Sequence, residues 1–234
     1  MYERLRPLDK SIDLPRMPAP ETCFPVHNPI AISIAPIEAA MMIERFPIAW
    51  RHMDGEWDLV ALTGLVPSQD TWRPGPGASG ARVIPLLLRA YPLALLDDGR
   101  DETVRVLVDE PALLTPWHPA VRLYSEQAGA AELEQRLQAL WAFANSRRAL
   151  QPAFRDVAAD GAFKPWDLSF RSARQSIALD GFFHVDWDYL GGEGHRRLVE
   201  RHGWLCASLL AFHRMSLHRV SALLRDLAAQ EQAA

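Results

Sequence analysis

The chain has 234 residues, of which 49% are hydrophobic and 23% are charged, and this suits one globular domain with a sizeable buried core. Its net charge of −4 at pH 7 argues against a protein that holds nucleic acid by an overall basic field. No stretch of the sequence approaches the ~18 consecutive apolar residues of a membrane-spanning helix, so we expect no membrane span.

The N-terminal part of the chain is rich in proline. Proline lacks an amide hydrogen and biases the residue before it toward extended conformations. The sequence therefore predicts a Pro-rich arm over residues 1–29, lying along the surface or disordered, followed by a single domain over residues 30–234. Charges are scattered through the arm and no secretory signal is visible, so we expect a cytoplasmic protein. Its two cysteines, Cys23 and Cys206, form no CxxC pair and are expected to be thiols.

The first elements after the arm are short. Residues 30–36 have the composition of a strand, and residues 36–46 predict a short helix with one apolar face. A hairpin is predicted next, with strands at 47–51 and 56–62 joined by an Asp-Gly turn. A loop rich in glycine and proline then follows.

The middle of the chain predicts a helical turn that ends at Pro92, a strand after it, and a second strand over residues 103–110 that pairs with the first. A long amphipathic helix is predicted over residues 126–149. Residues 154–171 are expected to form a loop that leads into a strand.

The last third of the chain predicts one more strand region around Asp180-Gly181 and two helical pieces over residues 194–230, broken near Gly203. Together the elements predict an α+β fold. It consists of a mostly antiparallel sheet of several short strands, packed by a long central helix and the C-terminal helices.

Four blocks of the sequence, taken in order, resemble the SapC family. They are "RFPIAWRHMDGEWDLVALTGL", "ARVIPLLLRAYPLAL", "IALDGFFHVDWDYL" and "ASLLAFHRMSLHRVSALL". The resemblance implies a bacterial accessory protein associated with surface-layer genes, with no set of family catalytic residues. It also implies a role beside a flavin-dependent halogenase-like enzyme or a TonB-dependent uptake system, exerted through a protein or peptide partner. An oligomer of the chain itself is compatible with this role.

Tryptophan and arginine are the residue types that dominate binding interfaces, and both occur in loop-like parts of this chain. Trp72 and Trp187 lie next to arginine or aspartate residues in such stretches and are candidate binding residues. Four of the eight tryptophans, including Trp72 and Trp187, lie in stretches of this kind. The alternative to a binding role is that they are isolated exposed aromatic residues, which are common on protein surfaces.

The family-like block around Pro85 supplies three further candidate binding residues, Arg82, Arg89 and Tyr91. The two arginines are seven residues apart, so they would share a helix face if the helix continues through Pro85. Two guanidinium groups on one face could bind a carboxylate in bidentate fashion. The alternative is that they form salt bridges to acidic residues of the same chain.

A metal site is the competing hypothesis. His184 and Asp186 have the spacing of the first two ligands of non-haem iron oxygenases, and His213 could supply the third ligand to Fe2+. The structural alternative places Phe182 in the core and lets Asp186 cap the next segment. The resemblance fixes the type of Asp186 but not of His184, so we expect no metal, no cofactor and no catalytic residue. No serine-nucleophile motif or phosphate-binding loop is present in the sequence.

Overall fold

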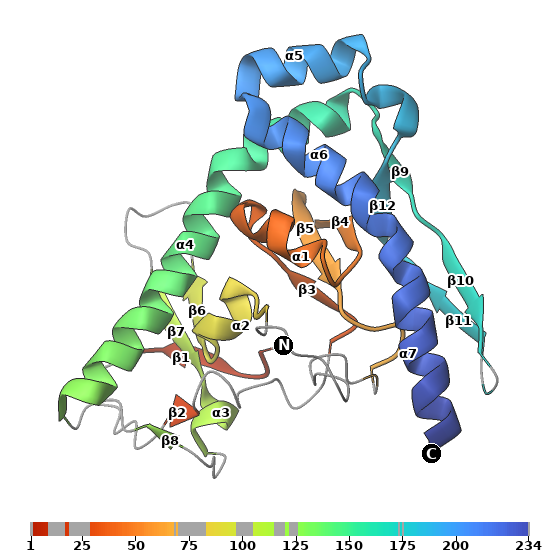
Figure 1. Cartoon of the computed structure of the whole chain (residues 1–234). Coiled ribbons are helices and arrows are strands. Elements are labelled where there is room, and N and C mark those ends of the chain that lie inside the picture. The colour runs from red at the N-terminus through yellow and green to blue at the C-terminus, as the bar shows by residue number, and fades with distance from the viewer. Residues whose placement is uncertain are drawn as a thin grey trace. The chain divides into compact units, whose positions relative to one another are not determined.

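The computed structural model, shown in Figure 1, describes residues 2–8, 17–18, 29–67, 69, 83–96, 105–114, 120–121, 126–172, 174 and 176–233. The chain forms two compact units. Unit 1 comprises Met1–His27 and Ile84–Asn145, and unit 2 comprises Asn28–Val83 and Ser146–Ala234. Helices account for 51% of the structure and strands for 25%, and the sheets are antiparallel, which confirms the predicted α+β class.

Unit 1 is built on a three-stranded antiparallel sheet. Its strand order is β1 (Leu5–Pro7), β7 (Arg105–Asp109), β6 (Leu93–Leu96), so residues of the predicted arm form one edge. Helix α2 (Leu86–Ala90) precedes β6, and α3 (Glu110–Leu114) follows β7. Strands β2 (Met17–Pro18) and β8 (Ala120–Val121) form a separate pair. The predicted helical turn and strand on either side of Pro92 are therefore confirmed.

A buried carboxylate holds the N-terminal residues of unit 1 on this sheet. Asp109 is 1% exposed, and its Oδ1 accepts hydrogen bonds from the main-chain N–H groups of Glu3 at 3.0 Å and Arg4 at 2.9 Å. Its Oδ2 accepts the hydroxyl proton of Tyr91 at 3.0 Å. Each bond satisfies an oxygen that burial has removed from water, so this part of the predicted arm is held by specific bonds.

Unit 2 contains a five-stranded antiparallel sheet and a two-stranded extension. The sheet order is β3 (Ala31–Ser33), β5 (Glu56–Leu62), β4 (Ile48–Met53), β12 (Phe182–Val185), β9 (Phe163–Pro165), and β10 (Leu168–Arg171) pairs with β11 (Ser176–Leu179). The turn between β4 and β5 has positive φ at Asp54 (52°) and Gly55 (81°). Two such residues give the turn that matches the twist of a hairpin, and the predicted hairpin is confirmed.

The helices that lie wholly within unit 2 come mostly from the end of the chain. They are α1 (Ala39–Met42), α5 (Glu193–His202), α6 (Trp204–Ser216) and α7 (Val220–Ala233), with short 3₁₀ turns η1 (Pro36–Glu38), η2 (Trp187–Tyr189) and η3 (Leu217–Arg219). Helix α6 packs against α1, β4 and β12 (Figure 1). Gly203 separates α5 from α6 with a φ of 78°, a conformation that glycine adopts without strain, which confirms the predicted break.

Helix α4 (Glu126–Ala159) is longer than the sequence predicts, and the predicted loop at its end is wrong for residues 154–159. The prediction ended the helix at residue 149, whereas the helix runs on through Pro152, which lacks the N–H that bonds to the preceding turn. The helix continues because packing outweighs that loss: Ala153, Phe154 and Val157 are at most 1% exposed. The ring of Phe154 meets Trp50 edge to face at 4.6 Å.

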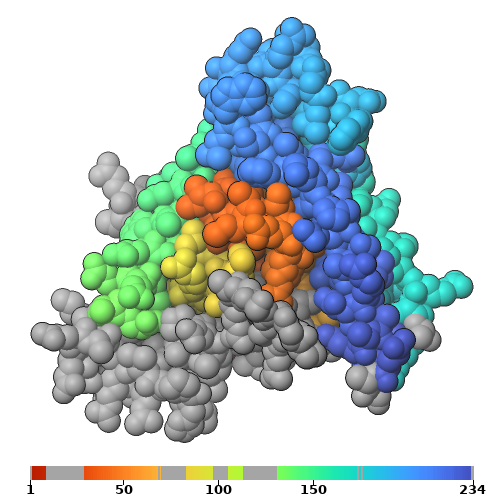
Figure 2. Space-filling model, viewed as in Figure 1, coloured from red at the N-terminus to blue at the C-terminus, as the bar shows by residue number. Residues whose placement is uncertain are grey.

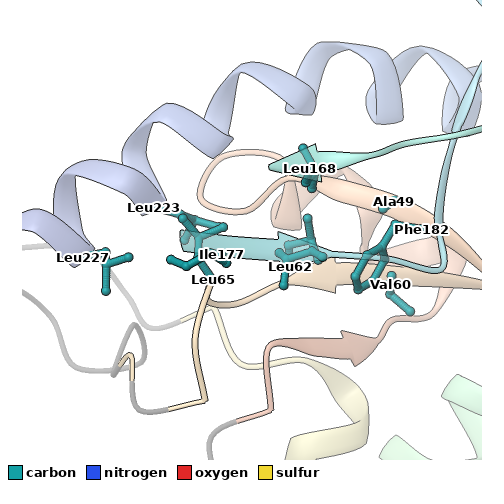
Figure 3. Packing of buried hydrophobic residues seen from close by; sticks show 10 residues of the cluster. Ala49, Val60, Leu62, Leu65, Leu168, Ile177, Phe182, Leu223 and Leu227 are labelled. Carbon is teal, nitrogen blue, oxygen red and sulfur yellow. The ribbon is translucent and has the colours of Figure 1, made fainter. Parts of the chain in front are cut away.

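One hydrophobic cluster of unit 2 joins the central hairpin to the extension and to α7 (Figure 3). Its ten buried residues are Ala49, Val60, Leu62, Leu65, Leu168, Ile177, Leu179, Phe182, Leu223 and Leu227. Phe182 therefore faces the core, as predicted. The cluster fixes β12, and with it the segment that follows, against the rest of unit 2.

Candidate functional site

The candidate binding residues fall in different parts of the chain. Trp72 and Arg82 lie outside the described residues. Arg89 and Tyr91 belong to unit 1, whereas Trp187 belongs to unit 2. The structure therefore does not bring the five together in one described site.

The predicted arginine clamp lacks the helix it requires. Helix α2 begins at Leu86, after Pro85 in an extended conformation (ψ 146°), so it cannot carry Arg82 and Arg89 on one face. Arg89 is exposed in the last turn of α2. Tyr91 is only 4% exposed, and its ring stacks on Tyr2 at 5.9 Å. Tyr91 is thus a core residue of unit 1, because its hydroxyl and ring have partners far away in sequence.

The segment after β12 is shaped by a capping carboxylate. Asp186 is the N-cap of η2, and its Oδ1 accepts a hydrogen bond from the N–H of Asp188 at 3.1 Å. Its Oδ2 lies 3.9 Å from Nζ of Lys164. These contacts match the structural alternative predicted for Asp186, and they hold Trp187, the first residue of η2, in a defined position.

The third ligand of the metal hypothesis, His213, has a structural role. His213 is fully buried; its Nε2 accepts a hydrogen bond from the N–H of Val185 at 3.0 Å, and its Nδ1 donates to the carbonyl of Ile48 at 2.7 Å. Burial lowers the pKa of His213 from 6.5 to about 3, so the ring is neutral. Neither ring nitrogen keeps a free lone pair for iron. Within the described part of the chain, no three metal-binding side chains gather at one point.

The exposed side chain of Trp187 pairs with Arg214, a half-buried arginine of α6. The Trp187 side chain is 63% exposed, and the guanidinium carbon of Arg214 lies 4.8 Å from the centroid of its ring. Nη1 of Arg214 also donates to the carbonyl of Val185 at 3.1 Å and lies 3.3 Å from Nδ1 of His184. No carboxylate of the described residues forms an ion pair with Arg214, and its Nε is buried without a hydrogen-bond partner. Sequence reasoning missed Arg214, which lies 27 positions from Trp187.

A pocket of about 220 Å³ lies in unit 2 between the end of α4, η2 and α5. Its lining residues are Asp156, Ala159, Asp160, Tyr189, Gly194, Arg197, Leu198 and Arg201. The charges of this pocket are paired with one another. Arg197 Nη2 lies 3.2 Å from Asp160, and Arg201 Nη1 lies 2.7 Å from Asp156. These ion pairs tie the end of α4 to α5. The two aspartates are four residues apart and so are the two arginines, and this spacing, which places each set on one side of its helix, is the signal that the sequence offers.

The same network shifts the pKa values of two of its members. Hydrogen bonds from His202 and Arg201 lower the pKa of Asp156, whereas burial and the hydrogen bond to Asp160 raise the pKa of Tyr189. The Tyr189 hydroxyl therefore stays protonated and donates to Asp160 at 3.1 Å. Because every charged group already has a partner, this arrangement ties α5 to α4 and offers neither a nucleophile nor a free base.

Comparison with known proteins confirms the resemblance seen in the sequence. The model of the SapC family matches residues 21–223 of the chain. No curated protein and no solved structure matches it. None of the helices in the described ranges is long and apolar enough to cross a membrane. Since the family model spans most of the sequence, this chain belongs to the SapC family.

Proposed function

We propose that this chain is an accessory protein that acts by binding a protein or peptide partner, and that Trp187 and Arg214 form the centre of the contact surface. The observation that carries the proposal is the stacked pair itself: an indole that is 63% exposed, with a guanidinium over its ring. Tryptophan and arginine are the residues most often found at the energetic centre of an interface.

The pair is held ready for binding. Asp186 caps the turn that carries Trp187, and the carbonyl of Val185 fixes Arg214. An anchor that is already ordered loses little conformational entropy when a partner covers it. Trp187 would then bury its free ring surface against an apolar group of the partner.

The charge of Arg214 indicates what else the partner supplies. A guanidinium that is covered without a carboxylate pays a desolvation cost, and Arg214 has no carboxylate partner among the described residues. We therefore expect the partner to place an aspartate, a glutamate or a C-terminal carboxylate beside Trp187. Arg89, exposed in unit 1, and Trp72 remain further candidate contact residues.

The family supplies the partner classes to test first. The resemblance suggests a flavin-dependent halogenase-like enzyme or a component of a TonB-dependent uptake system. Affinity capture from a native lysate, quantified by mass spectrometry, tests the proposal. The wild-type chain should enrich one partner, and Trp187→Ala should lose it while Trp141→Ala, a change at another partly exposed tryptophan, retains it. A purified chain that turns over a small molecule by itself, with no partner captured, would overturn the accessory role.

A further inference from the structure

Helix α6 is apolar on its outward side as well as on its inward side. Inward, Cys206, Leu209, Leu210 and His213 are buried. Outward, the exposed fractions are 75% for Trp204, 49% for Leu205 and 62% for Met215. Arg214 is the one charged residue of α6, because the buried ring of His213 is neutral.

The outward face, defined here as Trp204, Ser208, Ala211 and Met215, runs along one side of α6. The spacings of four, seven and eleven residues place these side chains above one another on a helix. Trp204, Ala211 and Met215 are exposed, and Ser208 is half-buried. A helix at the surface of a protein normally carries charged residues on this side, and an exposed apolar stretch marks an interaction site.

The order of side-chain sizes in the outward face is symmetric about its midpoint. Large side chains, Trp204 and Met215, stand at the two ends, and small ones, Ser208 and Ala211, stand between them. If a second copy of α6 lies antiparallel across a two-fold axis at this midpoint, Ser208 opposes Ala211 of the second copy. Trp204 then opposes Met215 of the second copy, so small meets small and large meets large.

A two-fold interface uses the same patch on both copies, so the patch must complement itself. The outward face satisfies that condition in shape, because its small centre allows two helices to approach closely. The outward face is also self-complementary in charge, because none of its residues is charged and a second copy brings no like charges together. A thioether against an indole is also a favourable contact. We propose that a second copy of this chain covers the outward face of α6 and that the chain forms a two-fold dimer.

The size of the surface sets the expected strength of the dimer. A stable interface covers roughly 800 Å² on each partner, more than a single helix face supplies. Helix α1 lies beside α6 (Figure 2). Two further exposed apolar residues lie in this part of the chain, Ile37 in η1 and Met41 in α1, with exposed fractions of 54% and 51%. The dimer is therefore expected to dissociate on dilution, with a Kd on the order of micromolar.

Analytical ultracentrifugation of the full chain tests this proposal. The wild type should pass from monomer to dimer as its concentration rises from about 1 to 300 μM, bracketing the expected Kd. Ala211→Glu, which places a carboxylate at the exposed centre of the face, should raise the Kd at least about tenfold. Met53→Glu adds the same charge at an apolar residue that is 44% exposed in the β4–β5 hairpin, and it should leave the Kd unchanged.

A second measurement tests the register without relying on a disruptive change. In a Cys23→Ser background, a mixture of Ser208→Cys and Ala211→Cys proteins should form the mixed disulfide dimer faster than either protein forms its own. Circular dichroism should show that every variant keeps the wild-type melting profile. A wild type that stays monomeric at 300 μM would overturn the proposal. So would equal weakening by Ala211→Glu and Met53→Glu, or a mixed disulfide that forms no faster than the others.

Discussion

The Nε2 atom of His213 lies 3.0 Å from the main-chain nitrogen of Val185 and accepts its hydrogen bond, while Nδ1 of the same ring donates to Ile48. One buried imidazole thereby ties α6 to the end of β12 and to the start of β4. The two bonds act together with the buried apolar residues of α6 to hold its inward side against the sheet. They also require the ring to stay neutral, because a protonated Nε2 cannot accept a hydrogen bond.

The stability of the chain should therefore depend on pH through His213. Burial lowers the folded-state pKa to about 3, whereas the unfolded ring has a pKa of 6.5, so between these values the unfolded state binds more protons. The contribution of His213 is fully present above pH 6.5 and is lost as the pH falls toward 3, by up to about 1.4 kcal/mol per pH unit. Urea unfolding of the wild type and of His213→Gln at pH 7, 6, 5 and 4 measures the slope.

The variant should be less stable at pH 7 but should lose less stability on acidification than the wild type. His218→Gln removes an exposed histidine of η3 and should keep the wild-type slope. If His213→Gln and the wild type lose stability in parallel from pH 6.5 to 4, the buried ring does not titrate as described.

The His184–Asp186 pair should bind no metal in stoichiometric amount. Oδ1 of Asp186 caps η2, and the cationic Arg214 lies beside Nδ1 of His184, which disfavours a bound cation. Elemental analysis of protein purified from its native host measures the metal content. Near-equimolar iron or zinc that disappears in His184→Ala would restore the oxygenase hypothesis, with a ligand set other than the one containing His213.

The thiol of Cys206 should be unreactive in the folded chain. It is fully buried, and burial, together with the charge of Asp156, raises its pKa to about 12, so almost no thiolate is present at neutral pH. Titration with a thiol reagent at pH 7 should leave Cys206 unmodified until denaturant is added. In denaturant both Cys206 and Cys23 should react without prior reduction. A disulfide between them in freshly prepared native protein would contradict this and would indicate export.

Local signals in the sequence predicted the elements whose cause is local. The Asp54-Gly55 turn and the alternating residues beside it predicted the hairpin, and Gly203 predicted the break between α5 and α6. The predicted end of α4 was wrong because Phe154 packs on Trp50. These residues are 104 positions apart, so rules that use only the local sequence to place a helix end do not include this contact. Packing of this kind overrides the helix preference of the local sequence.

The candidate site was predicted less completely for the same reason. Trp187 was found because an aromatic residue among polar neighbours is visible in the sequence, and the capping role of Asp186 was found from its position. Arg214 was missed because only the folding of α6 against β12 brings it to Trp187. Tyr91 was named as a binding residue from its place in the family-like block, and that block alone does not show that Asp109 of β7 bonds to its hydroxyl or that the ring is buried.

The most direct measurement is the affinity of the purified chain for the captured partner, by isothermal titration calorimetry. Truncation of an interface anchor costs about 2 kcal/mol or more, so Trp187→Ala should raise the Kd roughly thirtyfold. Arg214→Gln should raise it as well, and Arg196→Gln, at an exposed arginine paired with Glu193, should not. If Trp187→Ala and Arg214→Gln bind the partner with the wild-type Kd while remaining folded, the Trp187–Arg214 pair is not the contact surface.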